Sequence, residues 1–185
     1  DNTADASLGA AAPTTNSTAD PLLTMLLAGA TAAVETITRR ALVTQTWELR
    51  LDSFPEWELH VPKSPLQSVT SISYVDSNGD TQTLSPSKYL VDDKSEPARI
   101  TPAFGEVWPW TRWQMNAVTV RYICGYGAPG AVPQGIKDWI AMRMSALLEN
   151  PSEIVIDDRV AMAVIPKSFM DGLLNPYNVR EFTWA

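Results

Sequence analysis

The stretch that most constrains the fold runs over residues 20–52, because two different hydrophobic periods meet inside it. Asp20 can accept a hydrogen bond from an early helical N–H, and Pro21 is tolerated at the first helical position. Apolar residues then recur at steps of three and four, which predicts a helix over 20–39 with one stripe for burial: Leu22, Leu23, Leu26, Leu27, Ala30, Ala33, Val34 and Ile37. After two arginines suited to the carbonyl end of a helix, the period changes to two, which predicts a half-buried strand. Its inward-facing residues are Trp47, Leu49 and Leu51.

The middle of the chain repeats the two-residue period. Alternation over 57–61 predicts a second strand, antiparallel to the first, with Trp57 on its apolar face and His60 on its solvated face. Asn78-Gly79 lies between two further alternating runs, and it predicts a tight hairpin because both residues tolerate positive φ. Three more apolar runs, at 89–91, 99–100 and 118–124, complete an expected antiparallel β unit over 42–124.

A second apolar stripe predicts a helix over 133–149, which Asn150-Pro151 ends, and a short helix is expected over 166–174. The expected fold is therefore α+β: a small helical bundle with an inserted antiparallel β unit and extended terminal arms. The arms are 1–19 and 151–185, and the core is 20–150.

Composition excludes several classes of protein. The chain has 185 residues and is 45% hydrophobic, which is enough for a core. No run approaches 18 apolar residues and no basic-then-apolar leader begins the sequence, so we expect a soluble protein without membrane contact. The net charge of −7 argues against tight phosphate binding. Cys124, the single cysteine, lies in an apolar run and is expected to be a buried hydrophobe.

Reactive constellations are not expected either. His60 is the single histidine and lies far from any cysteine in the sequence, so a metal site is not expected. A nucleophile–base pair would have to use this same His60, and no glycine-flanked serine accompanies it. Residues 125–130 fit the G-x-G-x-x-G pattern of dinucleotide-binding proteins, but Pro129 removes an amide and hairpins precede the motif. We predict a strand-to-helix turn there, no cofactor and no enzymatic activity.

Three large aromatic residues, Trp108, Trp110 and Trp113, crowd into one predicted loop. They are compatible with packing on their own β unit, with contact to another subunit, or with stacking on a ligand such as a sugar. The last interpretation gives an alternative function, a carbohydrate-binding module.

Several strings between 20 and 150 resemble one known family. They are Asp20-Pro21-Leu22-Leu23, residues 40–49, Phe54-Pro55, and residues 65–72, 99–102, 116–120 and 132–137. Together they resemble the head–tail connector (adaptor, or head-completion) proteins of tailed bacteriophages and phage-like particles. The resemblance implies a non-enzymatic, typically dodecameric ring in the neck of the virion, assembled in the bacterial cytoplasm. The implied partners are the portal protein and a tail-side connector or stopper protein, and DNA passes through the ring without specific binding.

A ring requires heterologous contacts between neighbouring subunits. We predict subunit contacts at Trp108, Trp110, Trp113, Asn78 and Gly79. Phe182 and Trp184 are expected to dock on a neighbour, the portal or the tail; the alternative is that they fold back on their own helices. An acidic wall would let DNA slide, and the acids expected to face the channel are Glu153, Asp157 and Asp158.

Overall fold

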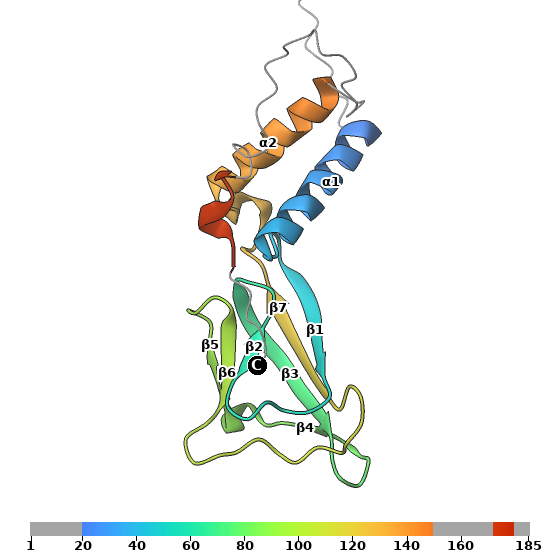
Figure 1. Ribbon diagram of the computed structural model, residues 1–185, viewed down its shortest axis with the longest axis vertical. Coiled ribbons are helices and arrows are strands. Elements are labelled where there is room, and N and C mark those ends of the chain that lie inside the picture. The colour runs from blue at the N-terminus through green and yellow to red at the C-terminus, as the bar shows by residue number, and fades with distance from the viewer. Residues whose placement is uncertain (1–19, 150–171, 180–185) are drawn as a thin grey trace, which may run out of the picture.

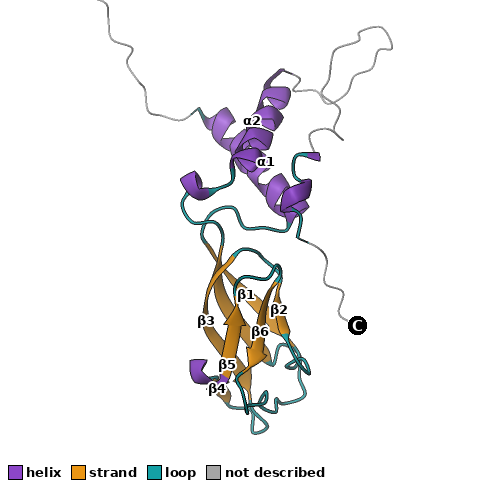
Figure 2. Cartoon of the chain, turned by 90° about the vertical axis from the view of Figure 1, so that its left-hand side faces the viewer, coloured by secondary structure: helices purple, strands orange, loops and turns teal. Residues whose placement is uncertain are grey.

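The computed structural model describes residues 20–149 and 172–179. Within these residues the molecule is elongated, with a pair of helices at one end and a β unit at the other (Figures 1 and 2). The helices are α1 (Pro21–Thr38) and α2 (Gln134–Glu149), which lie side by side. The helices predicted from the 3.6-residue period are thus present, and the α+β fold class is confirmed.

Helix α1 begins and ends as its sequence dictates. The side chain of Asp20 accepts a hydrogen bond from the N–H of Leu22 at 2.9 Å, and Arg39 ends the helix with φ of 58°. The buried stripe is shorter than predicted, because only Ala30, Val34 and Thr38 are buried. The leucines of the first turns remain about half exposed. The prediction that they are buried is therefore wrong for the subunit on its own.

Helix α1 meets one weak criterion for a membrane-spanning helix, although Thr24, Thr31 and Glu35 interrupt its apolar residues. By length and composition alone its 18 residues would suffice, a criterion that core helices of soluble proteins also meet.

The strands of the described residues form two antiparallel sheets. The four-stranded sheet has the order β1-β7-β3-β4, and the three-stranded sheet has the order β2-β6-β5. Their bounds are β1 Gln45–Leu51, β2 Leu59–Val61, β3 Leu66–Val75, β4 Thr81–Thr83, β5 Tyr89–Asp92, β6 Ala98–Pro102 and β7 Val118–Cys124. Strand β7 pairs with β1 on one side and β3 on the other, so the last strand in sequence is central.

Three predictions about the second strand are wrong. It pairs with β6 in the other sheet and not with β1, because residues 52–58 carry the chain from one sheet to the other. All three residues of β2 are buried, so His60 is not solvated; its Nε2 lies 3.0 Å from Oε1 of Glu58. Trp57 falls outside the strand and is 76% exposed.

Two hydrophobic cores divide the molecule. The larger lies within the β unit around Tyr122, and the smaller lies between the helices around Ile136 and Trp139. Cys124 is fully buried in the larger core, as predicted, and burial raises the pKa of its thiol to about 11.

The hairpin predicted at Asn78-Gly79 is confirmed: it joins β3 to β4 through residues 76–80. Gly79 has φ of 98°, whereas Asn78 is not in the positive-φ region. Oδ1 of Asp76 accepts hydrogen bonds from the N–H groups of Asn78, Gly79 and Asp80 at 2.9, 3.1 and 3.0 Å. The carboxylate therefore closes the loop together with two backbone hydrogen bonds, from the N–H of Asp76 to the carbonyl of Asp80 and from the N–H of Gly79 to the carbonyl of Asp76.

The glycines at 125–130 form a strand-to-helix turn, as predicted. Gly125 and Gly127 have φ of 116° and 113°, and a Cβ at Gly125 would lie 2.2 Å from the carbonyl oxygen of Val43. A short 3-10 helix, η2 (Pro129–Ala131), follows, so α2 begins only after Pro133. No helix N-terminus directly follows these glycines, as a dinucleotide site would require.

Candidate interaction surfaces

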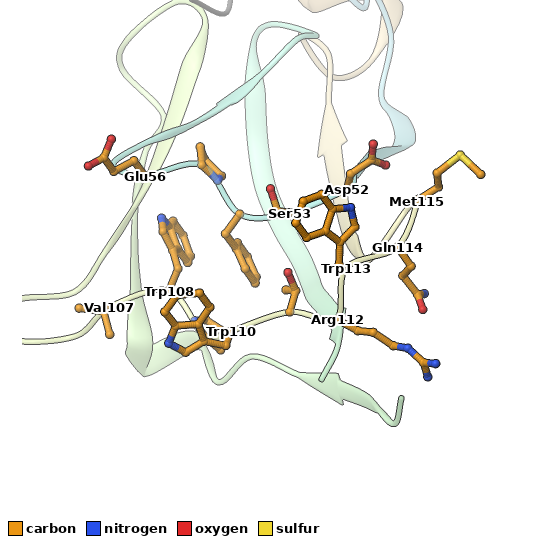
Figure 3. Close-up of a pocket in the computed structure, with 14 residues that line it drawn as sticks. Asp52, Ser53, Glu56, Val107, Trp108, Trp110, Arg112, Trp113, Gln114 and Met115 are labelled. Atoms are coloured by element: carbon orange, nitrogen blue, oxygen red, sulfur yellow. The ribbon is translucent and has the colours of Figure 1, made fainter. Parts of the chain in front are cut away.

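A groove lies at the end of the β unit away from the helices, and we call it the aromatic groove. It is lined by residues 52–56, which follow β1, and residues 107–115, which precede β7 (Figure 3). Its volume is about 1020 Å³. Chain segments far apart in sequence thus meet at one end of the molecule.

The three tryptophans of this groove do not share one environment. Trp108 stacks on Phe54, with ring centroids 4.8 Å apart and planes at 5°, and packs on the core of the β unit. Trp110 is 89% exposed and Trp113 is fully exposed. Trp108 therefore belongs to the core of its own chain. The three tryptophans do not form the platform of exposed rings that the carbohydrate-binding alternative would use.

Backbone hydrogen bonds hold the loop that carries the exposed rings. The N–H of Arg112 donates to the carbonyl of Val75 at 3.0 Å, and the N–H of Val75 donates to Ala117 at 2.8 Å. At the far end of the loop, Asn116 adopts φ of 55° and donates its N–H to Oδ1 of Asp52 at 2.8 Å. The exposed rings are thus presented on a fixed backbone, which lowers the entropy cost of binding a partner.

The aromatic groove and the loop that carries its tryptophans expose a large apolar surface. Besides the two indoles, Phe104, Val107 and Met115 are at least four-fifths exposed. Each large aromatic ring carries roughly 150–250 Å² of surface. This loop alone therefore reaches the size of the largest apolar patch of a typical monomer, about 300–600 Å². Patches of this size mark sites of interaction.

A second arrangement joins the helices to the β unit, and we call it the Arg40 joint. Arg40 follows α1 and is almost fully buried. Its guanidinium forms a two-pronged ion pair with the carboxylate of Glu96, with Nη1 2.6 Å from Oε1. It also lies 5.8 Å from the ring centre of Tyr126, and its Nε donates to the carbonyl of Tyr177 at 2.6 Å. Burial acts to lower the pKa of Arg40, but the bonds and charge of Glu96 outweigh it, so the net shift is upward.

The same joint fixes the segment that ends the described residues. The N–H of Val179 donates to the carbonyl of Thr38 at 3.2 Å, and Leu174 is buried between the helices. A Cβ on Gly135 would lie 2.9 Å from the hydroxyl of Tyr177, so α2 approaches this segment closely. The 3-10 helix η3 (Asn175–Tyr177) is therefore held between the helix pair and the β unit.

Several residues that the sequence singled out lie outside the described residues: Phe182, Trp184, Glu153, Asp157 and Asp158. Most of the short helix expected over 166–174 does so too.

Asn78 and Gly79 lie at the exposed tip of the β3–β4 hairpin, and the guanidinium of Arg112 lies over Gly79. Sequence reasoning missed the Arg40–Glu96 pair altogether, because nothing local marks their contact.

Across residues 20–149 and 172–179, no group of three or more His, Cys, Asp and Glu side chains is placed to hold a metal ion. The most concentrated charges are Arg99 with Asp92 at 2.7 Å and with Glu58 at 3.4 Å. The hydrogen bond from Arg99 lowers the pKa of Asp92 to about 2. This is an ion-pair network on the surface of the three-stranded sheet.

The fold and the two surfaces define a class: an α+β chain with a helix pair, an inserted two-sheet β unit and a prominent exposed apolar groove. Solved structures share this fold. A chain from the neck of a native GTA particle, computed with C12 symmetry, aligns with a TM-score of 0.69 at 21% identity, over 90% of this chain and 86% of that one. A chain from the neck of an empty GTA particle, computed with C6 symmetry, gives 0.68 at 21%, over 88% and 80%.

A third similar chain comes from the virion of a native gene transfer agent (GTA) particle, with a TM-score of 0.68 at 19% identity, over 88% of this chain and 79% of that one. No protein-family model matches the sequence, and no curated protein matches it. The fold implied by the resemblance to head–tail connectors is therefore confirmed.

Proposed function

We propose that this chain is a head–tail connector (adaptor) subunit of a phage or phage-like particle, located in the neck of the virion. Copies would form a ring between a portal protein and a tail-side connector or stopper protein, assembled in the bacterial cytoplasm. The observation that carries the proposal is the fold shared with neck chains over nine-tenths of this sequence. Their particles were solved with C12 and C6 symmetry, which supports a homo-oligomeric ring.

The distribution of apolar residues supports the same function. Exposed leucines lie on the first half of α1, and exposed aromatic residues lie at the opposite end of the molecule (Figure 1). A subunit that is covered by other chains at both ends would carry such surfaces. We assign four described residues to contacts between subunits: Trp110, Trp113, Asn78 and Gly79. Trp108 packs on the core and holds the loop that carries the two exposed rings.

The roles of the remaining residues follow from the ring. Phe182 and Trp184 directly follow the segment that the Arg40 joint fixes, so we assign them to a neighbour, the portal or the tail. Glu153, Asp157 and Asp158 are assigned to the channel, where negative charge would repel phosphates and let DNA slide. The net charge of −7 agrees with this role.

Two experiments test the function. Mass photometry and negative-stain electron microscopy of the purified protein, alone and mixed with the portal, should show closed rings or portal–ring complexes. A producer strain that lacks this chain should release heads and tails that do not join. A protein that stays monomeric, ignores the portal and is dispensable for joining would refute the proposal.

Removing residues 180–185 tests the terminal aromatic residues. Because Val179 is buried and bonded to Thr38, the truncation should begin after it. The expected product is folded but joins the particle poorly. Unfolding of the truncated chain would show that Phe182 and Trp184 belong to its own core.

A further inference from the structure

The three-stranded sheet has an apolar edge that no other described strand covers. Strand β5 is the outer strand of the order β2-β6-β5, and its outward backbone groups face no strand among the described residues. Leu90 is 60% exposed and Val91 is also exposed. An exposed apolar edge strand is a ready site for association with another chain. We call residues 88–94 the β5 edge.

The aromatic groove crosses the far end of the β unit, and its Trp113–Met115 end lies on the opposite side from the β5 edge. In Figure 1 β5 lies at one margin and β1 at the other, and Figure 2 views the molecule from the β5 side. Figure 3 shows Glu56 and Val107 at the end of the groove near β5 and β6, and Trp113 and Met115 at the other end, beside Asp52. The exposed end of the groove therefore points away from the β5 edge of its own chain.

This arrangement is what a ring contact needs. Rotation about a ring axis brings one flank of a subunit against the opposite flank of the next, at the same height along the axis. Both surfaces belong to the β unit, and both are apolar with charges at their margins. Charges of both signs border each surface: Asp52, Glu56 and Arg112 line the groove, and Lys88, Asp92, Asp93 and Lys94 lie along the β5 edge. Lys88 also lies 3.4 Å from Glu106, and Lys94 lies 3.2 Å from Asp93.

We infer that a second copy of this chain occupies the groove: the Trp113–Met115 end of one subunit packs on the β5 edge of the next. The indole of Trp113 covers Leu90, the more exposed of the two apolar side chains, and the mixed charges of each surface can be paired with opposite charges of the neighbour. The net charge of −7 disfavours an anionic membrane as the occupant. This contact rests on the proposed ring, and it adds which surfaces close that ring.

Chemical cross-linking tests the contact directly. Cys124 is the single native cysteine and is fully buried, so introduced thiols react without background. The double variant D93C/Q114C places thiols beside the two anchors and leaves Leu90 and Trp113 intact, because Asp93 is exposed in the β5 edge and Gln114 is exposed between Trp113 and Met115. Treated with a short bis-maleimide, it should give a ladder of covalent oligomers. Each single variant should give no ladder, because a heterologous contact never brings two copies of the same residue together. A control, D93C/T36C, places the second thiol on the exposed face of α1 and should also give none.

The outcomes separate this contact from the function. Rings seen by mass photometry without a ladder from D93C/Q114C would overturn the contact and leave the connector function standing. Absence of any ring or portal complex would overturn the function itself. Cross-linking of the single variants would show a symmetric contact, which also contradicts the inference.

A substitution series gives a second measurement. Trp113→Ala and Leu90→Asp should each weaken ring association about 30-fold or more, as for a central aromatic anchor of an interface. Phe104→Ala is the matched control, since Phe104 is fully exposed on the same loop but does not line the groove. Rings of Trp113→Ala that persist to the same dilution as wild type would mean that another partner occupies the groove.

Discussion

Replacing Arg40 by alanine tests whether one buried side chain holds the helix pair on the β unit. The change removes the ion pair with Glu96 and leaves the carbonyl of Tyr177 without its donor. Breaking a buried ion pair from one side costs about 3–5 kcal/mol. The side chain of Glu96 is 41% exposed, however, so water can solvate the carboxylate that remains. We therefore expect the lower end, a loss of about 3 kcal/mol in the free energy of unfolding.

Urea unfolding at fixed protein concentration, followed by tryptophan fluorescence, measures this loss. Arg50→Ala is the matched control: Arg50 also pairs with a glutamate, Glu48, but on the surface, where such pairs contribute about 0–1 kcal/mol. A double-mutant cycle of Arg40→Ala with Glu96→Ala should give a coupling energy above 1 kcal/mol, because the two side chains contact directly. Equal stability of Arg40→Ala and Arg50→Ala would refute the stabilising role of the Arg40 joint.

Three further predictions follow from burial and backbone geometry. Gly125→Ala should destabilise the fold by about 2 kcal/mol or more in urea unfolding, because a positive φ is strained and the new Cβ meets the carbonyl of Val43. Trp108→Ala should cost about 3–5 kcal/mol and Trp110→Ala less than about 0.5 kcal/mol, since only the first ring is packed; equal losses would contradict the assignment. The raised pKa of Cys124 means that the neutral thiol is favoured when folded, so its contribution to stability is complete below pH 9.0 and lost as the pH rises through about 11. Native protein should accordingly resist a thiol reagent at neutral pH, and rapid labelling would contradict the burial.

The helices were readable from the sequence, and the strand pairing was not. Hydrophobic period fixed α1 and α2 because each helix forms from local bonds. Period two located strands but carries no information about partners: Gln45 pairs with Cys124 across the sheet, while the nearest strand in sequence joins a different sheet. The alternation rule failed for His60 because both faces of β2 are covered.

The interaction surfaces were only partly readable for the same reason. Three tryptophans in six residues predicted a special loop, but the stack of Trp108 on Phe54 joins residues 54 positions apart and decides which rings remain exposed. The sequence identified Arg40 only as a basic residue at the carbonyl end of a helix. Its partner Glu96 lies in the loop between β5 and β6, and only the tertiary fold brings the two together. Local sequence identifies candidate residues, and tertiary contacts decide which of them are buried and which remain exposed.

The apolar stripe of α1 predicts burial, but the sequence does not say whether the same chain or another chain covers it. Leu22 and Leu27 are about half exposed and Met25 is more so, whereas Ala30 and Val34 are covered by α2 and its neighbours. Full burial of such a side chain contributes about 1.5–3 kcal/mol, so roughly half of that remains to be gained in contact with another chain. Leu22→Gln combined with Met25→Gln should therefore leave urea unfolding of the isolated subunit nearly unchanged while weakening ring formation in mass photometry. Thr36→Gln on the same helix is the control and should change neither. If the double variant unfolds much more readily than wild type, the first turns of α1 are buried by their own chain, and the stripe says nothing about assembly.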